Sequence, residues 1–267
     1  MTDAETTPRF SIVTPSLNQS AWLPQHLDSV RIASSESGRT VEHLIIDGGS
    51  TDGTLEILAG QEFSEWTSEP DRGQSDAINK GLARARGEIV SYLCADDLLE
   101  PTALRLVDRA FVDHPEADVV YGDGFFLEGE SGWKRLKCAG AYSVDRLRRG
   151  NFLIQPAVFW RRGVTEKFGG FDVRWQYCMD HAAWLRWAGS TRWIYVPEPL
   201  AVCRLHGAAK TSRALADAWR EAAVMQAEFG IRGKPQRDAL WMALIGQHYY
   251  RWKRRIFEEI GRRRKRE

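Results

Sequence analysis

Several features that mark other protein classes are missing from this chain. Its four cysteines lie far apart and form no CxxC pair, which excludes a zinc cluster and a disulfide framework and indicates a reducing compartment. No apolar run is long enough to span a membrane, and the polar N-terminus contains no apolar signal-peptide core. No Gly-x-Gly-x-x-Gly follows the first expected strand, which argues against an NAD-dependent oxidoreductase. We therefore expect a cytoplasmic protein of another class.

The charge of the chain is nearly balanced overall but uneven along its length. The 267 residues carry a net charge of +1, with 43% hydrophobic and 27% charged residues, as in ordinary soluble domains. Residues 251–267 alone carry a net charge of +6, so residues 1–250 carry about −5. The body of the protein is mildly acidic and its tail is basic.

The first 120 residues alternate short apolar runs with amphipathic stretches. This alternation is typical of an α/β fold with a mostly parallel central sheet flanked by helices. Ligands of such sheets bind outside the carboxyl ends of the strands. We predict strands at Phe10–Thr14, Val41–Asp47, Glu65–Ser68, Ile89–Cys94 and Val119–Tyr121, and helices at Ala21–Ala33, Thr54–Ala59, Ser75–Arg86 and Thr102–Asp113.

The pattern changes after residue 123. From Ala214 the chain has the composition of a helical extension that runs to its end, with a break at Gly230–Pro235. Between these points we predict a hairpin of Phe125–Glu128 and Lys134–Lys137, a helical turn at Ser143–Gly150, strands at Ala157–Trp160 and Arg192–Val196, a helix at Met179–Ala188, and an extended segment at Leu200–His206.

Asp96 and Asp97 directly follow the buried strand Ile89–Cys94. Two adjacent carboxylates at such a place repel each other and lose hydration unless a cation or hydrogen-bond donors compensate. Mg²⁺ and Mn²⁺ take oxygen ligands and are commonly shared with substrate phosphates. The pair therefore predicts a site for a metal ion and a diphosphate, although an Asp-Asp pair can also cap a following helix.

Seven stretches, in this order, resemble the family 2 glycosyltransferases, and together they are far more specific than any one of them. They are Ser11-Ile-Val-Thr-Pro-Ser-Leu-Asn18, Ile45-Ile-Asp-Gly-Gly-Ser-Thr-Asp-Gly-Thr54, Ser68-Glu-Pro-Asp-Arg-Gly-Gln-Ser-Asp-Ala-Ile-Asn-Lys-Gly81, Ala83-Arg-Ala-Arg-Gly87, Ala95-Asp-Asp97, Met179-Asp-His-Ala-Ala-Trp-Leu-Arg186 and Arg204-Leu-His206.

The resemblance covers roughly residues 9–212. It implies the A-type fold of nucleotide-diphospho-sugar transferases, and an inverting transfer of a sugar from such a donor to a hydroxyl of a glycan or lipid-linked acceptor. It also implies dependence on Mg²⁺ or Mn²⁺. We expect residues 9–123 to hold the donor and 124–212 to supply acceptor contacts and the base, with 213–267 as a helical extension ending in the basic tail.

The same resemblance suggests which residues bind the donor. Asp76 and Lys80 are four residues apart on one helix face, where an exposed ion pair of small value is the simpler explanation. A turn with an Asn cap would likewise explain the first loop. By resemblance, Thr14, Pro15 and Asn18 border the base and ribose, Asp47 contacts the base, Asp76 lies near the base or ribose, Asp96 lies near the ribose or the metal ligands, and Lys80 and Lys210 lie near the phosphates.

The family's metal motif and base are only partly preserved. Asp97 corresponds to the metal ligand, and His206 to a group on the metal or diphosphate, but Ala95 stands where a strict Asp-x-Asp motif has its first aspartate. Asp180 corresponds to the general base, with Met179 replacing the acid that often precedes it. An N-cap is the alternative role for Asp180.

The tryptophans around Asp180 suggest both packing and binding. Trp184 and Trp187 are three residues apart on one helix face and are expected to pack in the core. Trp175 lies in a polar loop and is the residue expected to contact the acceptor.

The basic tail interleaves aromatic and aliphatic side chains with Lys and Arg. A solvated helix end is the simpler explanation. Because many relatives use lipid-linked acceptors, we expect instead a peripheral contact with an anionic membrane at the inner face of the plasma membrane. No nucleic-acid partner is expected, since no recognition fold is evident.

Two other functions stay open. A non-catalytic sugar-nucleotide or glycan-binding protein of the same fold would explain the acids missing beside Asp97 and Asp180. A sugar-phosphate nucleotidyltransferase shares the architecture, but it would carry a Gly-rich loop with an arginine where this chain has Thr14-Pro-Ser-Leu-Asn18. The sequence specifies neither the nucleotide and sugar of the donor, nor the acceptor, the linkage or the oligomeric state.

Overall fold

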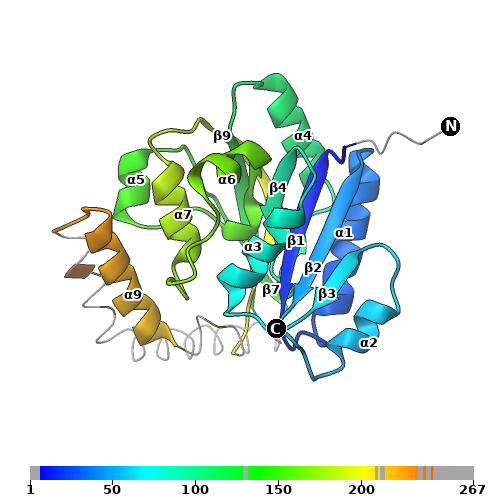
Figure 1. The fold of residues 1–267 in the computed structure, drawn as a ribbon. Coiled ribbons are helices and arrows are strands. Elements are labelled where there is room, and N and C mark those ends of the chain that lie inside the picture. The colour runs from blue at the N-terminus through cyan, green and yellow to red at the C-terminus, as the bar shows by residue number, and fades with distance from the viewer. Residues whose placement is uncertain are drawn as a thin grey trace, which may run out of the picture.

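The computed structural model describes residues 7–128, 132–207, 210, 214–233, 237–238 and 242 (Figure 1). A single nine-stranded sheet runs through it, in the order β3-β2-β1-β4-β8-β6-β9-β5, with β7 paired to β6. Its strands are β1 (Phe10–Ser16), β2 (Val41–Asp47), β3 (Glu65–Ser68), β4 (Ile89–Tyr92), β5 (Leu98–Leu99), β6 (Val119–Glu128), β7 (Trp133–Lys137), β8 (Val158–Arg161) and β9 (Trp193–Leu205).

Helices flank the sheet on both sides, as Figure 1 shows. They are α1 (Leu23–Ser37), α2 (Thr54–Ala59), α3 (Gln74–Arg84), α4 (Ala103–Asp113), α5 (Val144–Arg149), the 3₁₀ turn η2 (Gln155–Ala157), α6 (Arg162–Phe168), α7 (Met179–Trp187) and α9 (Leu215–Glu228). Among the described residues, no helix combines the length and the apolar character needed to cross a membrane.

Parallel pairing joins β3, β2, β1 and β4 and recurs between β6 and β9. The strands β5, β7 and β8 pair antiparallel with their neighbours. The predicted α/β fold is thus confirmed. The purely parallel part, β3-β2-β1-β4, lies in the first 120 residues, where strands and helices were predicted to alternate. Two predicted pairs of strands are in fact single strands, since β6 and β9 each continue through the expected breaks.

Alternate residues of the strands bury opposite faces of the sheet, because successive side chains of a strand point to opposite sides. Phe10 and Ile12 of β1 pack in one core cluster with residues of α1 and α4. Val13 and Val90 belong to a second cluster on the other face, together with Ile78 of α3 and residues of α6 and α7. Both faces of the sheet are therefore covered.

Tryptophans dominate the core beneath α7. Trp160, Trp184 and Trp187 are fully buried, and the ring centroids of the last two lie 4.9 Å apart. The packing predicted for Trp184 and Trp187 is confirmed. The acceptor contact predicted for Trp175 is wrong, because this side chain is only 6% exposed and packs in the same core cluster.

The motif glycine Gly87 has a packing reason. Its N–H donates to Ser11 Oγ at 2.8 Å, and a Cβ at this position would lie 2.5 Å from the Ser11 nitrogen and 2.6 Å from the Phe10 carbonyl carbon. Backbone atoms of a buried strand cannot move aside as a flexible side chain can.

We therefore expect Gly87→Ala to lower the free energy of unfolding by about 1–3 kcal/mol or more, as overpacked cores do. Urea unfolding followed by circular dichroism measures this. The matched control is Gly189→Ala, since an added Cβ there meets no atom within 4 Å. Equal stability of the two variants would contradict the packing explanation.

Candidate active site

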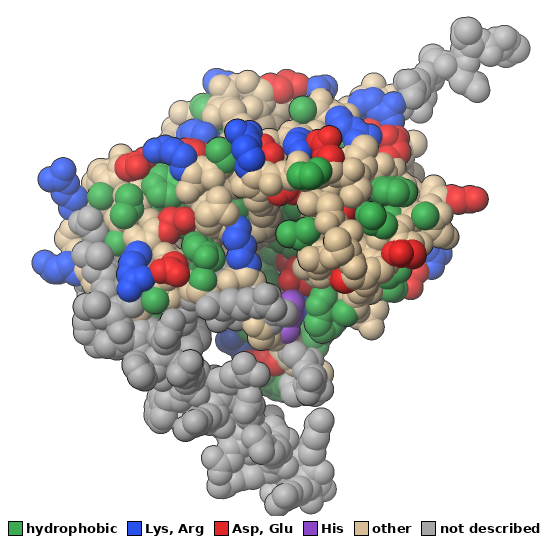
Figure 2. Space-filling view, turned by 60° about the horizontal axis from the view of Figure 1, so that its bottom comes forward, with side chains coloured by type: hydrophobic (Ala, Val, Ile, Leu, Met, Phe, Trp, Pro, Cys, Tyr) green, Lys and Arg blue, Asp and Glu red, His purple; other side chains and the backbone are tan. Residues whose placement is uncertain are grey.

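The carboxyl ends of β1, β2 and β4 meet at one edge of the sheet, at the bottom of Figure 1. Figure 2 brings this edge forward and shows a hollow in which acidic and histidine side chains are visible. The Asp96-Asp97 pair follows β4 at this edge, and the Asp47 loop follows β2. The polar residues predicted to share one crevice therefore follow strands that end at the same edge of the sheet.

Asp97 is buried and held by the end of β9. Asp97 is only 5% exposed, and its Oδ1 accepts a hydrogen bond from the backbone N–H of Arg204 at 2.9 Å. Burial raises the pKa of the Asp97 carboxyl well above its ordinary value, and the charge of Asp96 raises it further. The fold thus keeps two close carboxylates whose repulsion is only partly compensated.

Asp96 meets the imidazole of His206. The Nε2 atom of His206 lies 3.0 Å from Asp96 Oδ2, and the imidazole ring lies 4.9 Å from the ring of Trp22. The Nδ1 atom of His206 is buried and has no hydrogen-bond partner among the described residues. The two residues assigned to the ribose or the metal are thus direct neighbours.

The residues at the end of β4 fit a divalent cation. The ligand atoms of Cys94, Asp96 and Asp97 all lie within 4.8 Å of one another. A cation there would relieve the carboxylate repulsion that raises the pKa of Asp97. Carboxylate oxygens are the ligands that Mg²⁺ and Mn²⁺ prefer, and waters and phosphate oxygens commonly complete their coordination.

Asp180 lies in the first turn of α7 and is partly buried. Its Oδ2 accepts the side-chain N–H of Asn151 at 2.9 Å, and its Oδ1 accepts the backbone N–H of His181 at 2.7 Å. Burial raises the pKa of Asp180 above its ordinary value, against the opposing effect of these hydrogen bonds. Sequence reasoning missed Asn151, which lies outside every motif that it used.

Asp97 and Asp180 border the same buried region. Burial raises the pKa of the Cys94 thiol well above its ordinary value, and the charges of both Asp97 and Asp180 raise it further. Burial also raises the pKa of Tyr92 at the end of β4, and the charges of Asp180 and Asp97 raise it further. Both carboxylates therefore lie close enough to Cys94 for their charges to act on its thiol.

The family model described as "Glycosyl transferase family 2" matches residues 11–170, which is more than half of the chain. The chain belongs to this family. It is an enzyme that transfers glycosyl groups, and the sequence resemblance is confirmed.

Relatives and solved structures agree with this assignment. The glycosyltransferase is 34% identical over 179 residues to a PGL/p-HBAD biosynthesis glycosyltransferase of Mycobacterium bovis, which covers 65% of this chain and 67% of that protein. Residues 1–349 of TarS from S. aureus, in complex with UDP-GlcNAc, superpose with a TM-score of 0.65 at 16% identity, covering 91% and 73% of the chains. The mannosyltransferase PcManGT from Pyrobaculum calidifontis, in complex with GDP-Man and Mn²⁺, gives 0.60 at 18% identity, covering 91% and 71%. These structural likenesses confirm the A-type glycosyltransferase fold.

The first donor-side loop of the glycosyltransferase is tied to the second. Asn18 has a positive φ of 54° and is exposed, and its Oδ1 accepts the backbone N–H of Thr51 at 2.9 Å. Pro15 is buried in β1. The Asp47 carboxylate is fully buried, with Oδ2 accepting the backbone N–H groups of Gly49 and Ser50 at 3.0 and 2.8 Å. Because Asp47 is fully buried, a base contact would require its surroundings to move, and that role stays a prediction.

Asp76 and Lys80 lie on the same face of α3, but each has a nearer partner. The Asp76 carboxylate accepts from Arg72 Nη2 at 2.7 Å, whereas Lys80 Nζ is 3.9 Å from it and 2.7 Å from Glu69 Oε1. The hydrogen bond from Arg72 lowers the pKa of Asp76. Both side chains can reorient toward a ligand only by leaving these partners.

Two lysines approach the crevice from later segments. Lys210 Nζ lies 3.4 Å from Gln176 Oε1 and 5.6 Å from the centre of the Tyr177 ring. Lys137 of β7 is half-buried, and burial lowers its pKa while the charges of Cys203 and Asp180 act in the opposite sense. Sequence reasoning missed Lys137, because a lysine on a hairpin strand resembles any solvated charge.

A chain of buried hydrogen bonds lies behind the crevice. His26 Nδ1 is 2.9 Å from the backbone oxygen of Asp97, and its Nε2 is 2.9 Å from Thr14 Oγ1. Thr14 Oγ1 is also 2.9 Å from His43 Nε2, and His43 Nδ1 is 2.7 Å from Ser64 Oγ. The Thr14 side chain therefore points into the interior, and the place beside the base and ribose predicted for Thr14 stays a prediction.

The direction of this chain follows from its last acceptor. A carbonyl oxygen only accepts, so His26 Nδ1 carries the proton and Nε2 accepts from the Thr14 hydroxyl. That hydroxyl accepts from His43 Nε2–H, and His43 Nδ1 accepts from the Ser64 hydroxyl. This direction requires both imidazoles to be neutral, which burial favours by lowering the pKa of His26 to about 4 and that of His43 well below its ordinary value.

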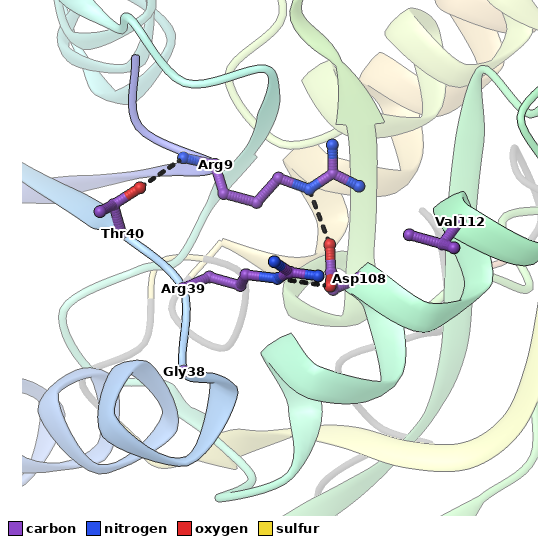
Figure 3. A pocket seen from close by; sticks show the side chains of 6 residues that line it. All are labelled: Arg9, Gly38, Arg39, Thr40, Asp108 and Val112. Atoms are coloured by element: carbon purple, nitrogen blue, oxygen red, sulfur yellow. Dashed lines mark hydrogen bonds and ion pairs between the residues drawn. The ribbon is translucent and has the colours of Figure 1, made fainter. Parts of the chain in front are cut away.

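A second hollow lies at the opposite end of β1 (Figure 3). Arg9 and Arg39 point at Asp108 there, with their Nε atoms 2.7 and 2.8 Å from its two carboxylate oxygens. The backbone N–H of Arg9 donates to Thr40 Oγ1 at 3.1 Å. The arginines hold the start of the sheet to α4, and this hollow is remote from the crevice.

His43 makes stability depend on pH. Burial lowers its pKa well below the ordinary value, so the unfolded chain binds a proton there that the folded chain does not as the pH falls below about 6.5. The free energy of unfolding therefore falls with falling pH, by up to about 1.4 kcal/mol per pH unit for this group. We expect His43→Gln, which keeps an N–H for Thr14, to flatten the slope between pH 6.5 and 5. An unchanged slope in urea unfolding would contradict a neutral His43.

Proposed function

We propose that this glycosyltransferase inverts the anomeric centre, transferring a sugar from a nucleotide-diphospho-sugar to a hydroxyl of a glycan or lipid-linked acceptor. Asp180 is the general base, and Asp97 is the ligand of a divalent cation. The observation that carries the proposal is that Asp97 and Asp180 both lie near Cys94: the ligand atoms of Cys94 and Asp97 are within 4.8 Å of each other, and the charge of Asp180 acts on the same thiol. A leaving group and an incoming hydroxyl have to meet in such a place.

Asp180 is oriented for this role. The N–H groups of Asn151 and His181 each occupy one of its oxygens, which leaves further lone pairs on both oxygens for a hydroxyl proton. In the transfer the acceptor oxygen bonds to the anomeric carbon as its proton passes to Asp180. The bond from that carbon to the diphosphate oxygen breaks, and the electron pair leaves with the diphosphate. One displacement inverts the centre.

The donor would lie along the carboxyl ends of β1, β2 and β4. The loops of Asn18 and Asp47 would border its base, and Lys210 would approach its phosphates. Asp97, with Asp96 and His206 beside it, would hold Mg²⁺ or Mn²⁺, an ion that supplies positive charge against the diphosphate. The UDP-GlcNAc and GDP-Man complexes of structures with the same fold support a nucleotide-sugar donor, and the Mn²⁺ complex supports the ion.

Contact of the basic tail with an anionic membrane stays a prediction. Residues 251–267 lie outside the residues that the structure describes. The domain limits near residues 123 and 212 likewise stay predictions.

A thermal-shift panel identifies the donor. UDP-, GDP- and dTDP-sugars are each tested with and without Mn²⁺, and a ligand at 100 times its Kd raises stability by about 2.7 kcal/mol. We expect one nucleotide to stabilise the protein in a Mn²⁺-dependent manner. Release of nucleoside diphosphate from that donor then measures turnover without a known acceptor.

Asp97→Asn and Asp180→Asn test the proposed metal ligand and the proposed base separately. Asp97→Asn should abolish the Mn²⁺-dependent part of the thermal shift. Asp180→Asn should keep that shift but lower kcat by about 10²–10⁴-fold, as loss of a general base does. Turnover that survives Asp180→Asn would exclude the proposed base and favour a binding protein or another mechanism.

The raised pKa of Asp180 has a consequence for the pH–rate profile. A base works only when ionised, so kcat/KM falls as the pH drops through its pKa. Because burial raises that pKa, we expect the acid limb to lie above the value of about 3.9 for an exposed aspartate. The profile is measured from pH 3.5 to 8, and an acid limb at or below about 3.9 would contradict the assignment.

A further inference from the structure

Glu221 of α9 grips the segment that leads into α7. Its Oε2 accepts the backbone N–H of Gln176 at 2.8 Å, and its Oε1 accepts those of Tyr177 and Cys178 at 2.6 and 2.9 Å. The Cys178 thiol also donates to Oε1 at 3.2 Å. One carboxylate therefore binds three consecutive N–H groups, 43 to 45 residues away along the chain.

These N–H groups need a partner from outside the helix. Cys178 is the N-cap residue of α7, and its side chain makes no capping hydrogen bond. The first N–H groups at a helix start have no partner within the helix, and a carboxylate near that end is favoured by the helix dipole. Hydrogen bonds to a charged acceptor are about twice as strong as neutral ones. Glu221 thus binds one such N–H group at the start of α7, that of the N-cap residue Cys178, together with the two N–H groups that precede it.

The same segment is held from the donor side by α3. Asn79 binds Phe171 twice, donating to its oxygen and accepting from its N–H, both at 2.7 Å. The Ser75 hydroxyl donates to Met179 Sδ at 2.9 Å. Residues 171–179 are therefore fixed between α3 and α9, and Asp180 follows directly.

The grip of Glu221 also reaches the donor side of the crevice. The N–H of Gln176 is one of its three donors, and Gln176 Oε1 is the atom that accepts from Lys210 Nζ. A Cβ at Gly73, the N-cap of α3, would lie 3.1 Å from that same oxygen. Displacing residues 176–178 would therefore shift the base and a cationic side chain together.

We propose that Glu221 is a positioning residue for the general base Asp180, which makes α9 part of the catalytic unit. This inference rests on the proposed function of Asp180. The family match ends at residue 170, so α9 lies beyond it. The partners of Glu221 are the backbone N–H groups of residues 176–178. Glu221 acts through the backbone of residues 176–178, whose position sets where the first turn of α7 presents the carboxylate.

The test compares Glu221→Ala and Glu221→Gln with Asp217→Asn. Asp217 lies on the same helix and pairs only at the surface with Arg220, at 2.7 Å, so the control removes one charge without touching the segment. Glu221→Gln keeps one acceptor oxygen for Tyr177 and Cys178, but its amide group meets the N–H of Gln176 donor to donor. Glu221→Gln is the milder change, and it keeps the proposal testable if Glu221→Ala does not fold.

Hydrogen–deuterium exchange gives a readout that does not need turnover. We expect the amides of residues 176–178 to exchange at least about tenfold faster in Glu221→Ala, and less so in Glu221→Gln, since each loses part of its acceptor. Asp217→Asn should match the parent protein. Unchanged protection in both Glu221 variants would overturn the proposal.

Turnover then shows whether the hydrogen bonds of Glu221 to residues 176–178 are needed to position Asp180. With the donor selected by the thermal-shift panel, we expect kcat of Glu221→Ala to fall about 10–100-fold, as small misplacements of a reacting group do. Glu221→Gln should lie between, and in both variants KM should change by a smaller factor than kcat, while a Mn²⁺-dependent thermal shift remains. Variants with lost protection but parental kcat would overturn the positioning role alone. A parent protein that turns over no donor would overturn it together with the proposed function.

Discussion

The structure depends on two adjacent carboxylates at the end of a buried strand. Asp96 and Asp97 repel each other and are poorly hydrated, and several distant segments converge to reduce that cost. The backbone N–H of Arg204, 107 residues away, binds the Asp97 side chain, and His206 binds Asp96. His26 binds the Asp97 carbonyl through its Nδ1 proton. The end of β9 therefore has to lie beside the end of β4, and the crevice forms where these segments meet.

Asp180 follows a segment that residues of two other helices hold in place. Asn79 and Ser75 of α3 bind the segment that leads into α7, and Glu221 of α9 binds the same segment from behind. A helix next to the nucleotide region thus helps to fix the proposed base. Segments before and after residue 123 are thus joined directly by these hydrogen bonds.

The parallel half of the fold was predictable because its signals are local. Alternating apolar residues and helix periodicity located β1, β2, β4 and α3 to within a few residues. The long strand β6 was expected as two pieces, because Asp123 interrupts the apolar run. Its carboxylate is in fact buried, accepting from the Ala139 N–H and the Tyr195 hydroxyl at a register shift between β6 and β9. A buried polar residue whose partners lie elsewhere cannot be distinguished from a strand end by periodicity.

By itself, the sequence determined the order of the elements, the family, and the residue types placed at the strand ends, since motifs and periodicities are properties of neighbouring residues. Only the tertiary structure decided which of those residues touch. It turned Thr14 inward between two histidines, buried Trp175, and brought Glu221 to the segment that precedes Asp180, from a part of the chain that carried no signal. The physical reason is that buried hydrogen-bonding groups must find partners wherever the packed chain provides them. Such pairings, over 12 residues for Thr14 and His26 and 44 for Glu221 and Tyr177, leave no local pattern.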